Sequence, residues 1–257
     1  MWISFTTDYG RRDGFVAACH GAIAKIEPTA RVIDVTHEIM PGNVARGAVV
    51  LAQTVGDLPT GVHLAVVDPG VGTARRSIAL RAPGGLLVGP DNGLLIWAAE
   101  ALGGVTDAVE LTNPAWFAPV VTRTFHGRDI FAPVAARLAG GAALHEAGPA
   151  IDPAVLARLP EPEVESGDGW LAAEVLNVDR FGNVQLAATA LPAPVGHQVR
   201  IGEQRAVVGE TFADVPQGGL VVLLDSAGQL AVAANGAPAD DALDVVPGDV
   251  VRITVNS

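Results

Sequence analysis

Cysteine, lysine and long apolar runs are scarce in this sequence, and each scarcity excludes a class of protein. Cys19 is the single cysteine among 257 residues, so one chain can form neither an internal disulfide nor a multi-cysteine metal site. Lys25 is the single lysine and the formal net charge is −12, whereas binding to phosphate backbones requires clustered basic side chains. We therefore expect no nucleic-acid partner. No run of about 18 apolar residues is present, so we also expect no membrane partner.

The residues that are abundant indicate a folded protein. Apolar residues make up 49% of the chain and charged residues 17%, which favours a packed core over disorder. The opening residues, MWISFTTD, have no basic stretch before the apolar positions, and a polar loop follows them closely. We interpret this segment as a first strand and not as a signal peptide. These features together predict a cytoplasmic protein.

The first two thirds of the chain alternate strand patterns with helix patterns. Strands are predicted over residues 2–6, 31–36, 61–67, 76–81, 86–88 and 107–111. Helices are predicted over residues 15–26, 44–55, 94–102 and 130–138, with Asn43 as the cap of the second. This alternation predicts an α/β N-terminal domain with a mainly parallel sheet that helices cover on both faces.

The pattern changes near residue 155. Residues 159–169 combine proline, glycine and acidic side chains, which is typical of an exposed linker. Short β-type runs separated by turn residues then follow over 171–178, 184–186, 198–201, 220–224, 230–233 and 250–255. We therefore predict an α/β domain over residues 1–158, a linker over 159–169 and a small all-β barrel over 170–257.

Polar residues lie where the predicted parallel strands end, which is the edge at which α/β proteins bind ligands. Asp8, His37 and Asp68 follow the first three strands. Each has a purely structural alternative: Asp8 is also suited to holding a turn, and a packed core histidine is the favoured interpretation of His37. Residues 91–93 form a good tight turn by themselves, and Asp129 is well placed to cap the helix predicted at 130.

A divalent-metal site is the main alternative that the residues alone allow. Its hard ligands would come from Asp8, Asp13, His37, Asp68 and His126. No closely spaced pair of ligands occurs among them, and arginines in the same loops would compete with a cation for the carboxylates, so we expect no metal. The motif GxSxG of serine hydrolases is absent. The pair Gly70 and Gly72 lacks the third glycine and the following helix of a dinucleotide fingerprint, which excludes a nicotinamide site.

Six short motifs in a fixed order make the sequence similar to a known family. They are TTDYG (6–10), DVTHEI (34–39), VDPGVGT (67–73), GPDNG (89–93), TFHGRDIF (124–131) and DRFGN (179–183). With them the sequence resembles the S-adenosyl-L-methionine (SAM) hydroxide adenosyltransferase family, the adenosine-forming SAM hydrolases, which is related to SAM-dependent fluorinase and chlorinase. The resemblance covers nearly the full length. It implies an α/β domain followed by a β-barrel, SAM as substrate with no further cofactor, and a homotrimer with active sites between subunits.

The resemblance also implies roles for individual residues. Asp8 would accept both ribose hydroxyls, Asn183 would bind the adenine edge with one donor and one acceptor, and Phe181 would stack on the purine. The methionine end of SAM is implied to contact Asp179, Ser226 and, with a weaker match, Asp13.

The set implied to act on the nucleophile is Asp68, Arg75 and His126. A carboxylate and an imidazole can accept hydrogen bonds and a proton from water, and a guanidinium can orient them. The sequence leaves two points open. A shift of one residue in the loop would exchange Arg75 with Arg76, and Asp68 with Arg75 would also serve as a structural ion pair with His126 beside it.

The charge of Asp68 bears on which nucleophile is used. A carboxylate about 4 Å from a halide repels it by roughly 4 kcal/mol at an effective dielectric constant near 20, and by less where Arg75 offsets the charge. The fluorinase branch has an uncharged residue at the position of Asp68. We therefore predict hydrolysis of SAM to adenosine and L-methionine by attack of water on the ribose C5′. A SAM-dependent halogenase and a SAM-binding sensor with incidental turnover are the alternatives.

Overall fold

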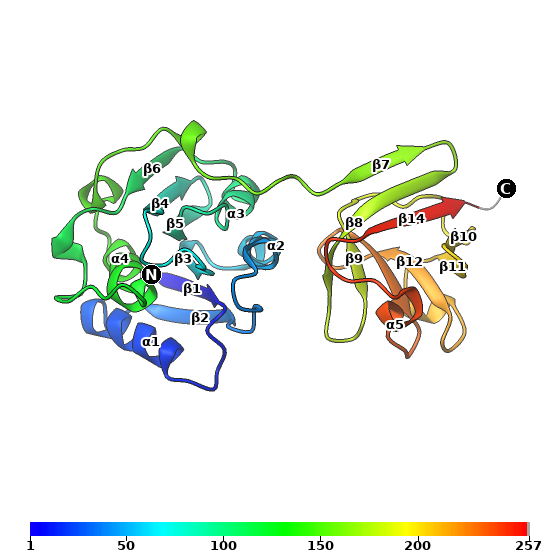
Figure 1. Cartoon of the computed structure of the whole chain (residues 1–257), viewed down its shortest axis with the longest axis horizontal. Helices are drawn as coiled ribbons and strands as arrows, with labels where there is room; N and C mark the ends of the chain where they lie inside the picture. The colour runs from blue at the N-terminus through cyan, green and yellow to red at the C-terminus, as the bar shows by residue number, and fades with distance from the viewer. Residues whose placement is uncertain (256–257) are drawn as a thin grey trace. The chain divides into compact units, whose positions relative to one another are not determined.

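The computed structural model describes residues 1–255 and contains two compact units (Figure 1). Met1–Leu159 form the first unit and the residues from Pro160 onward form the second. The first is an α/β unit with a mostly parallel sheet and the second is a closed β-barrel, so the predicted fold class is confirmed. No helix within residues 1–255 combines the length and apolar content needed to cross a membrane.

The first unit is built on a six-stranded sheet with the order β2-β1-β3-β5-β4-β6. Its strands are β1 (Trp2–Thr7), β2 (Arg31–Thr36), β3 (Gly61–Val66), β4 (Ser77–Ala82), β5 (Gly85–Pro90) and β6 (Asp107–Glu110). Strands β1, β2, β3 and β5 run parallel, and β4 runs antiparallel to both of its neighbours. The start of β4 therefore lies at the same edge of the sheet as the ends of the parallel strands.

Helices cover both faces of this sheet (Figure 1). They are α1 (Phe15–Ile26), α2 (Val44–Thr54), α3 (Ile96–Ala101) and α4 (Ala132–Ala139). One core joins α1 and α4 to side chains such as Phe5 and Leu64, and a second joins α2 and α3 to side chains such as Ala65 and Val67. Strand β3 supplies both cores, with Val62, Leu64 and Val66 in the first and Ala65 in the second, because successive side chains point to opposite faces.

Helix α2 begins as the sequence predicts. The Asn43 side chain accepts a hydrogen bond of 2.9 Å from the backbone N–H of Arg46, which satisfies one of the unpaired donors of the first turn. The chain then passes from β2 to β3, which lies on the other side of β1. The ends of β1 and β3 are thus adjacent at a point where the strand order reverses, and such points are the ligand-binding positions of open α/β sheets.

The second unit is a barrel of seven strands with one additional strand. Its strands are β7 (Val164–Gly167), β8 (Trp170–Val178), β9 (Val184–Leu186), β10 (Gln198–Ile201), β11 (Gln204–Val208), β12 (Leu220–Leu224), β13 (Leu230–Ala234) and β14 (Val250–Val255), with the short helix α5 (Ala239–Leu243). Pairing of β14 with β8 closes the barrel, which removes the exposed strand edges that would otherwise invite aggregation. Apolar side chains such as Val175, Val222 and Ile253 fill its interior.

The structure differs from the sequence prediction at three elements of this unit. Strand β7 occupies residues that we predicted to be linker, because the turn at Asp168 and Gly169 folds them back to pair with β8. Strand β11 and helix α5 were not predicted. Strand β11 begins with polar residues, and α5 has only five residues, so neither shows a sustained periodic pattern.

Candidate active site

Four of the candidate residues lie at the ligand-binding edge of the parallel sheet. Asp8 directly follows β1, Asp68 lies two residues after β3, and Arg75 lies two residues before β4. His126 lies immediately before a π-helical turn, Gly127–Phe131, that leads into α4. The fold therefore brings together side chains that are separated by more than a hundred residues in the sequence.

Arg75 joins Asp68 to His126. Its Nε donates to Asp68 Oδ1 at 2.9 Å and to Oδ2 at 3.1 Å, and its Nη2 also donates to Oδ2. Arg75 Nη2 lies 2.9 Å from His126 Nδ1, and Nη1 donates to Ser77 Oγ at 2.7 Å. The side chains of Asp68 and Arg75 are only 5% and 11% exposed, so this pairing is shielded from solvent. A guanidinium whose three nitrogens all have partners is held in one orientation.

The neighbouring arginine has a different role. Arg76 donates from Nε to Asp91 Oδ2 at 2.7 Å and from Nη2 to the carbonyl oxygen of Val155, also at 2.7 Å. Asp91 in turn accepts a hydrogen bond from the backbone N–H of Ala157. The sequence left Arg75 and Arg76 interchangeable. In the structure, Arg75 contacts Asp68 and His126, whereas Arg76 fastens the segment around residue 155 to the sheet.

The contact with Arg75 determines which nitrogen of His126 carries a proton. A guanidinium can only donate, so His126 Nδ1 must be the acceptor, and in the neutral ring the proton is then on Nε2. Burial and the adjacent Arg75 lower the pKa of His126, which favours this neutral form at pH 7. His126 therefore presents an Nε2–H donor and has no free basic nitrogen.

Asp8 is close to this group. Its Oδ2 accepts a hydrogen bond of 2.9 Å from the backbone N–H of Gly42, and no other residue among those described, besides Asp8 itself, donates to the carboxylate. Burial raises the pKa of Asp8; the hydrogen bond from Gly42 opposes this shift, and the nearby charge of Asp68 adds to it. The carboxylate is thus held on one side and open on the other.

Tyr9 was not selected from the sequence, yet it packs between these loops. A Cβ atom at Gly127 would lie 2.0 Å from the Tyr9 hydroxyl oxygen, so the chain can pass there only with glycine. The Tyr9 ring contacts Phe125 edge-on, with ring centroids 5.7 Å apart. Its position after Asp8 in the motif TTDYG was the available signal. We infer that Tyr9 fixes the distance between the Asp8 loop and the His126 loop.

The predicted capping role of Asp129 is wrong. The π-helical turn begins before it, at Gly127, so Asp129 lies inside the turn and is buried. It accepts hydrogen bonds from the N–H and the hydroxyl of Thr122 at 2.8 and 2.6 Å, and one from Arg128 Nε at 2.6 Å. These bonds tie the segment before His126 to the start of α4. Asp129 therefore positions the loop instead of starting the helix.

The second unit contributes a turn between β8 and β9. Asp179 Oδ1 accepts from the backbone N–H groups of Phe181 and Asn183 at 2.8 and 3.0 Å, and its Oδ2 accepts from Asn183 Nδ2 at 2.8 Å. This carboxylate holds the turn in one conformation and orients the Asn183 amide, so that its carbonyl oxygen is left to accept. The Phe181 ring is 68% exposed, which is unusual for a large apolar side chain.

A cavity of about 620 Å³ lies beside this turn. It is lined by Asp179, Phe181, Asn183, Phe212, Ala234, Gly236, Ala237 and Pro238. Three of the residues selected from the sequence thus share one wall of a cavity within the size range of small-molecule sites. Phe212 was missed, because a lone aromatic in the segment between β11 and β12 carries no sequence signal.

Two candidate residues are not gathered with the others. Ser226 is exposed in the turn between β12 and β13 and does not line the cavity. Asp13 is exposed in the turn before α1. The metal site that the residues alone allowed is not formed by its proposed ligands either. Arg75, itself a cation, lies between Asp68 and His126.

These features define a class of enzyme. Its first unit is an α/β domain with a polar site at the strand ends, and its second unit is a β-barrel with a cavity that aromatic side chains help to line. Residues 3–148 match the family model of the SAM hydroxide adenosyltransferase N-terminal domain, and residues 173–252 match the model of the corresponding C-terminal domain. The chain belongs to the SAM hydroxide adenosyltransferase family.

Individual relatives agree with this assignment. A protein of Salinispora arenicola named (R)-S-adenosyl-L-methionine hydrolase is 64% identical over 98% of this chain and 97% of its own length. A fluorinase of Actinoplanes sp. is more distant, at 31% identity over 98% and 97% of the two chains. The crystal structure of an uncharacterized conserved protein from Thermotoga maritima, 37% identical, matches with a TM-score of 0.91 over 98% of this chain and 99% of that one.

Proposed function

We propose that this protein hydrolyses (R)-S-adenosyl-L-methionine to adenosine and L-methionine by attack of water on the ribose C5′. Relatives with the corresponding name share up to 64% of its residues across nearly the whole chain. The observation that carries the mechanism is the buried set in which Arg75 holds both Asp68 and His126. This set can bind one water molecule between an acceptor and a donor.

In the proposed site, water donates a hydrogen bond to Asp68 and accepts one from His126 Nε2–H. The remaining lone pair of the water oxygen then faces C5′, opposite the sulfur. As the C–O bond forms and the C–S bond breaks, the pair of electrons leaves with sulfur and neutral methionine departs. The attacking oxygen becomes positively charged and transfers a proton to the Asp68 carboxylate, which is the available acceptor because Arg75 occupies His126 Nδ1.

Departure of the leaving group requires little assistance from the enzyme. A sulfonium is already an excellent leaving group, so no general acid and no cofactor beyond the substrate is required. The main contributions are positioning of the two reacting atoms and exclusion of competing water. Arg75, held by Asp68, Ser77 and His126, provides the fixed reference for that positioning.

The remaining residues are proposed to bind SAM. Asp8 has a free oxygen and accepts the ribose hydroxyls, Phe181 stacks on adenine, and Asn183 binds the adenine edge. Asp179, Ser226 and Asp13 are proposed for the methionine end. The two carboxylates and the formal charge of −12 suit a substrate with a sulfonium and an ammonium group. Adenosine formation needs no metal in this scheme.

Water is favoured over a halide by hydrogen bonding more than by net charge. Because Arg75 is bonded to Asp68, the pair is close to neutral and repels an anion only weakly. A carboxylate, however, can only accept hydrogen bonds, and a halide has no proton to donate. The halogenase alternative therefore lacks a partner for the halide at Asp68.

We further propose a cytoplasmic homotrimer in which neighbouring subunits complete each site. The exposed Phe181 ring and the single lysine are consistent with a surface that meets a small ligand and another subunit instead of nucleic acid or membrane. Light scattering of the purified protein gives the oligomeric state directly. A monomer that turns over SAM at full rate would contradict the shared site.

The activity is tested with tag-free protein, (R)- or (S)-SAM and water enriched in heavy oxygen. We expect adenosine that carries the heavy isotope on its 5′ oxygen, formed faster from the (R) epimer. Formation of a 5′-halo-adenosine in halide buffer would instead support the halogenase, and SAM that is bound but unchanged would support the sensor. Asp107→Asn, an exposed carboxylate on β6, is the matched control for Asp68→Asn.

A further inference from the structure

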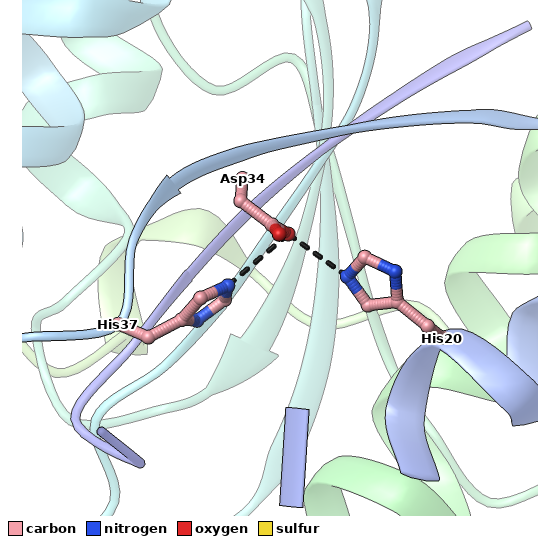
Figure 2. A group of neighbouring side chains, drawn as sticks. All are labelled: His20, Asp34 and His37. Atoms are coloured by element: carbon pink, nitrogen blue, oxygen red, sulfur yellow. Dashed lines mark hydrogen bonds and ion pairs between the residues drawn. The ribbon is translucent and has the colours of Figure 1, made fainter. Parts of the chain in front are cut away.

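Three side chains that the proposed mechanism does not use converge on a single oxygen atom (Figure 2). His20 lies on α1, Asp34 lies on β2, and His37 follows the end of β2. His20 Nε2 is 2.8 Å from Asp34 Oδ1, and His37 Nε2 is 3.1 Å from the same oxygen. Figure 2 shows the two imidazole rings directed at the carboxylate from opposite sides. Helix α1 and the end of β2 thus bring two imidazoles and a carboxylate together.

The spacing of these atoms fits a metal ion. The three potential ligand atoms lie within 4.8 Å of one another. Zinc binds imidazole nitrogen and carboxylate oxygen at about 2.0–2.2 Å, which places neighbouring ligand atoms of a tetrahedral site about 3.3–3.6 Å apart. The separations of 2.8 and 3.1 Å are shorter, so small side-chain rotations would have to widen them on metal binding.

His37 contacts Thr7 through Nδ1, so Nε2 is the nitrogen available to a cation. Its Nδ1 lies 2.8 Å from Thr7 Oγ1, and that oxygen also accepts a bond of 3.2 Å from the backbone N–H of Tyr9. If Nδ1–H donates to Thr7, the Nε2 lone pair faces Asp34. A metal-binding imidazole commonly has its second nitrogen fixed in this way.

His37 Nε2 is also without a hydrogen bond. The side chain is 1% exposed, and although Nε2 is near Asp34 Oδ1, the approach is not aligned for a hydrogen bond. A buried nitrogen left without a partner is unfavourable for the folded state. A cation bound to both Nε2 and Oδ1 would give this nitrogen a partner.

We propose that His20, Asp34 and His37 bind one divalent transition-metal ion, with Zn²⁺ as the best match. Two imidazoles with one carboxylate suit zinc and its first-row neighbours, whereas magnesium and calcium prefer sites made of oxygen alone. The side chains of His20 and Asp34 are 36% and 32% exposed, which gives an ion access from solvent and leaves room for water ligands.

The ion would act on structure and not on the reaction. The His37 carbonyl oxygen accepts a hydrogen bond of 2.7 Å from the N–H of Gly10, and the His37 ring contacts Thr7. Thr7 and Gly10 lie on either side of Asp8 in the chain. Binding of the ion would therefore order the loop that presents Asp8. Only this last consequence rests on the proposed function.

Metal binding is tested directly on tag-free protein that has been treated with a chelator and dialysed. Titration with Zn²⁺ in a calorimeter should give one ion per chain, and Co²⁺ should give the visible absorption bands of a site with nitrogen and oxygen ligands. The melting temperature should rise with metal. Absence of saturable binding, or binding of similar strength in the variants below, would overturn the proposal.

The variants His20→Gln and Asp34→Asn should each weaken Zn²⁺ binding at least a hundredfold. His20 is partly exposed on α1, so its replacement is not expected to prevent folding, and circular dichroism checks this for both variants. His145→Ala, an exposed histidine of the same unit, is the matched control and should bind metal as the native chain does.

A second measurement separates this site from the proposed reaction. With metal removed, or in His20→Gln, the KM for SAM should rise severalfold while kcat at saturating SAM is unchanged. If the protein lacks hydrolase activity altogether, the calorimetric and Co²⁺ results still decide the metal site. If it binds no metal but hydrolyses SAM, only the metal proposal fails.

Discussion

The α/β unit and the barrel each carry a group of candidate residues, and the two groups are held in opposite ways. At the edge of the α/β sheet, Asp68 and Arg75 are almost completely buried and bonded to each other. On the barrel, Asp179 makes a rigid turn that presents Phe181, with a ring that is 68% exposed, to solvent. A group that positions a reacting atom must be fixed before the substrate arrives, whereas an aromatic surface gains binding energy when the substrate covers it.

The largest effect on activity is expected at the buried Asp68–Arg75 pair of the α/β unit. Replacement Asp68→Asn removes the proposed proton acceptor with little change of shape, so kcat should fall about 10²–10⁴-fold while the KM for SAM changes little. Steady-state measurement of adenosine release tests this, with Asp107→Asn as control. An unchanged kcat with a raised KM would show that Asp68 binds substrate and does not act on water.

The α/β unit should also carry the stronger dependence of stability on pH. His63 on β3 is 1% exposed, its Nδ1 lies 2.8 Å from Ser4 Oγ, and burial lowers its pKa from 6.5 to about 4. A histidine with a lowered pKa in the folded state stabilises the fold fully above pH 6.5 and loses that contribution as the pH falls towards 4. The loss should total about 3 kcal/mol.

Denaturant unfolding of the native chain and His63→Asn at pH 7.5, 6 and 5 measures this contribution. Asparagine places a polar group near the position of Nδ1 but does not titrate, so the variant should lose less stability between pH 7.5 and 5. The exposed His197→Asn in the barrel is the control and should behave as the native chain does. Identical pH profiles for native protein and His63→Asn would refute the assignment.

Replacement of Asp8 tests whether this carboxylate binds substrate, in contrast to Asp68, which is proposed to act on water. Its free oxygen is proposed to accept ribose hydroxyls in both ground state and transition state, so Asp8→Ala should raise the KM for SAM about a hundredfold with a smaller effect on kcat. Asp8→Asn keeps an acceptor for the Gly42 N–H and should lose less. A loss confined to kcat would contradict the assignment.

On the barrel, Phe181→Ala should weaken binding of SAM and of adenosine about 10- to 50-fold, as expected for the loss of one base–aromatic stack. The value of kcat should stay within a few-fold, because the ring is proposed to contact only the purine. Calorimetric titration with adenosine measures the effect without turnover. Phe181→Leu keeps apolar area but lacks the aromatic face, and equal affinity for this variant would argue against stacking.

The smallest effect concerns the acid side of the pH profile. His126 must be neutral to accept from Arg75 and to donate from Nε2, and burial together with Arg75 lowers its pKa. The value of kcat should therefore stay constant from pH 8 to about 6.5, the ordinary pKa of histidine, and decline only below it. A decline that begins above pH 7 would mean that His126 is not held in this form.

Much of the fold follows from the order of the sequence patterns. The helix at Phe15–Ile26, the strand at Arg31–Thr36 and the Asn43 cap are where the periodicity and capping rules place them. Patterns fail where local signals are weak. Strand β7 depends on a partner strand, and α5 has too few residues to show a period. The π-helical turn at Gly127–Phe131 depends on contacts with Tyr9 and Thr122, which lie outside it.

Sequence alone also selects the residue types at the site but not their connections. The motifs identify Asp68, His126 and an arginine in the loop between β3 and β4. The choice of Arg75 over Arg76, the proton on His126 Nε2 and the packing of Tyr9 against Gly127 depend on distances across loops. The cluster of His20, Asp34 and His37 likewise has no linear spacing that indicates a metal.

The sequence by itself determined the α/β domain, the barrel, the family and the charged side chains that face the ligand edge. Those properties follow from local periodicity and from motifs of consecutive residues. Tertiary structure alone decided which arginine meets Asp68, which nitrogen of His126 donates, and that two histidines share one oxygen of Asp34. The physical reason is that hydrogen bonds depend on the direction and distance between atoms from separate strands, and the order of residues along one chain does not fix these.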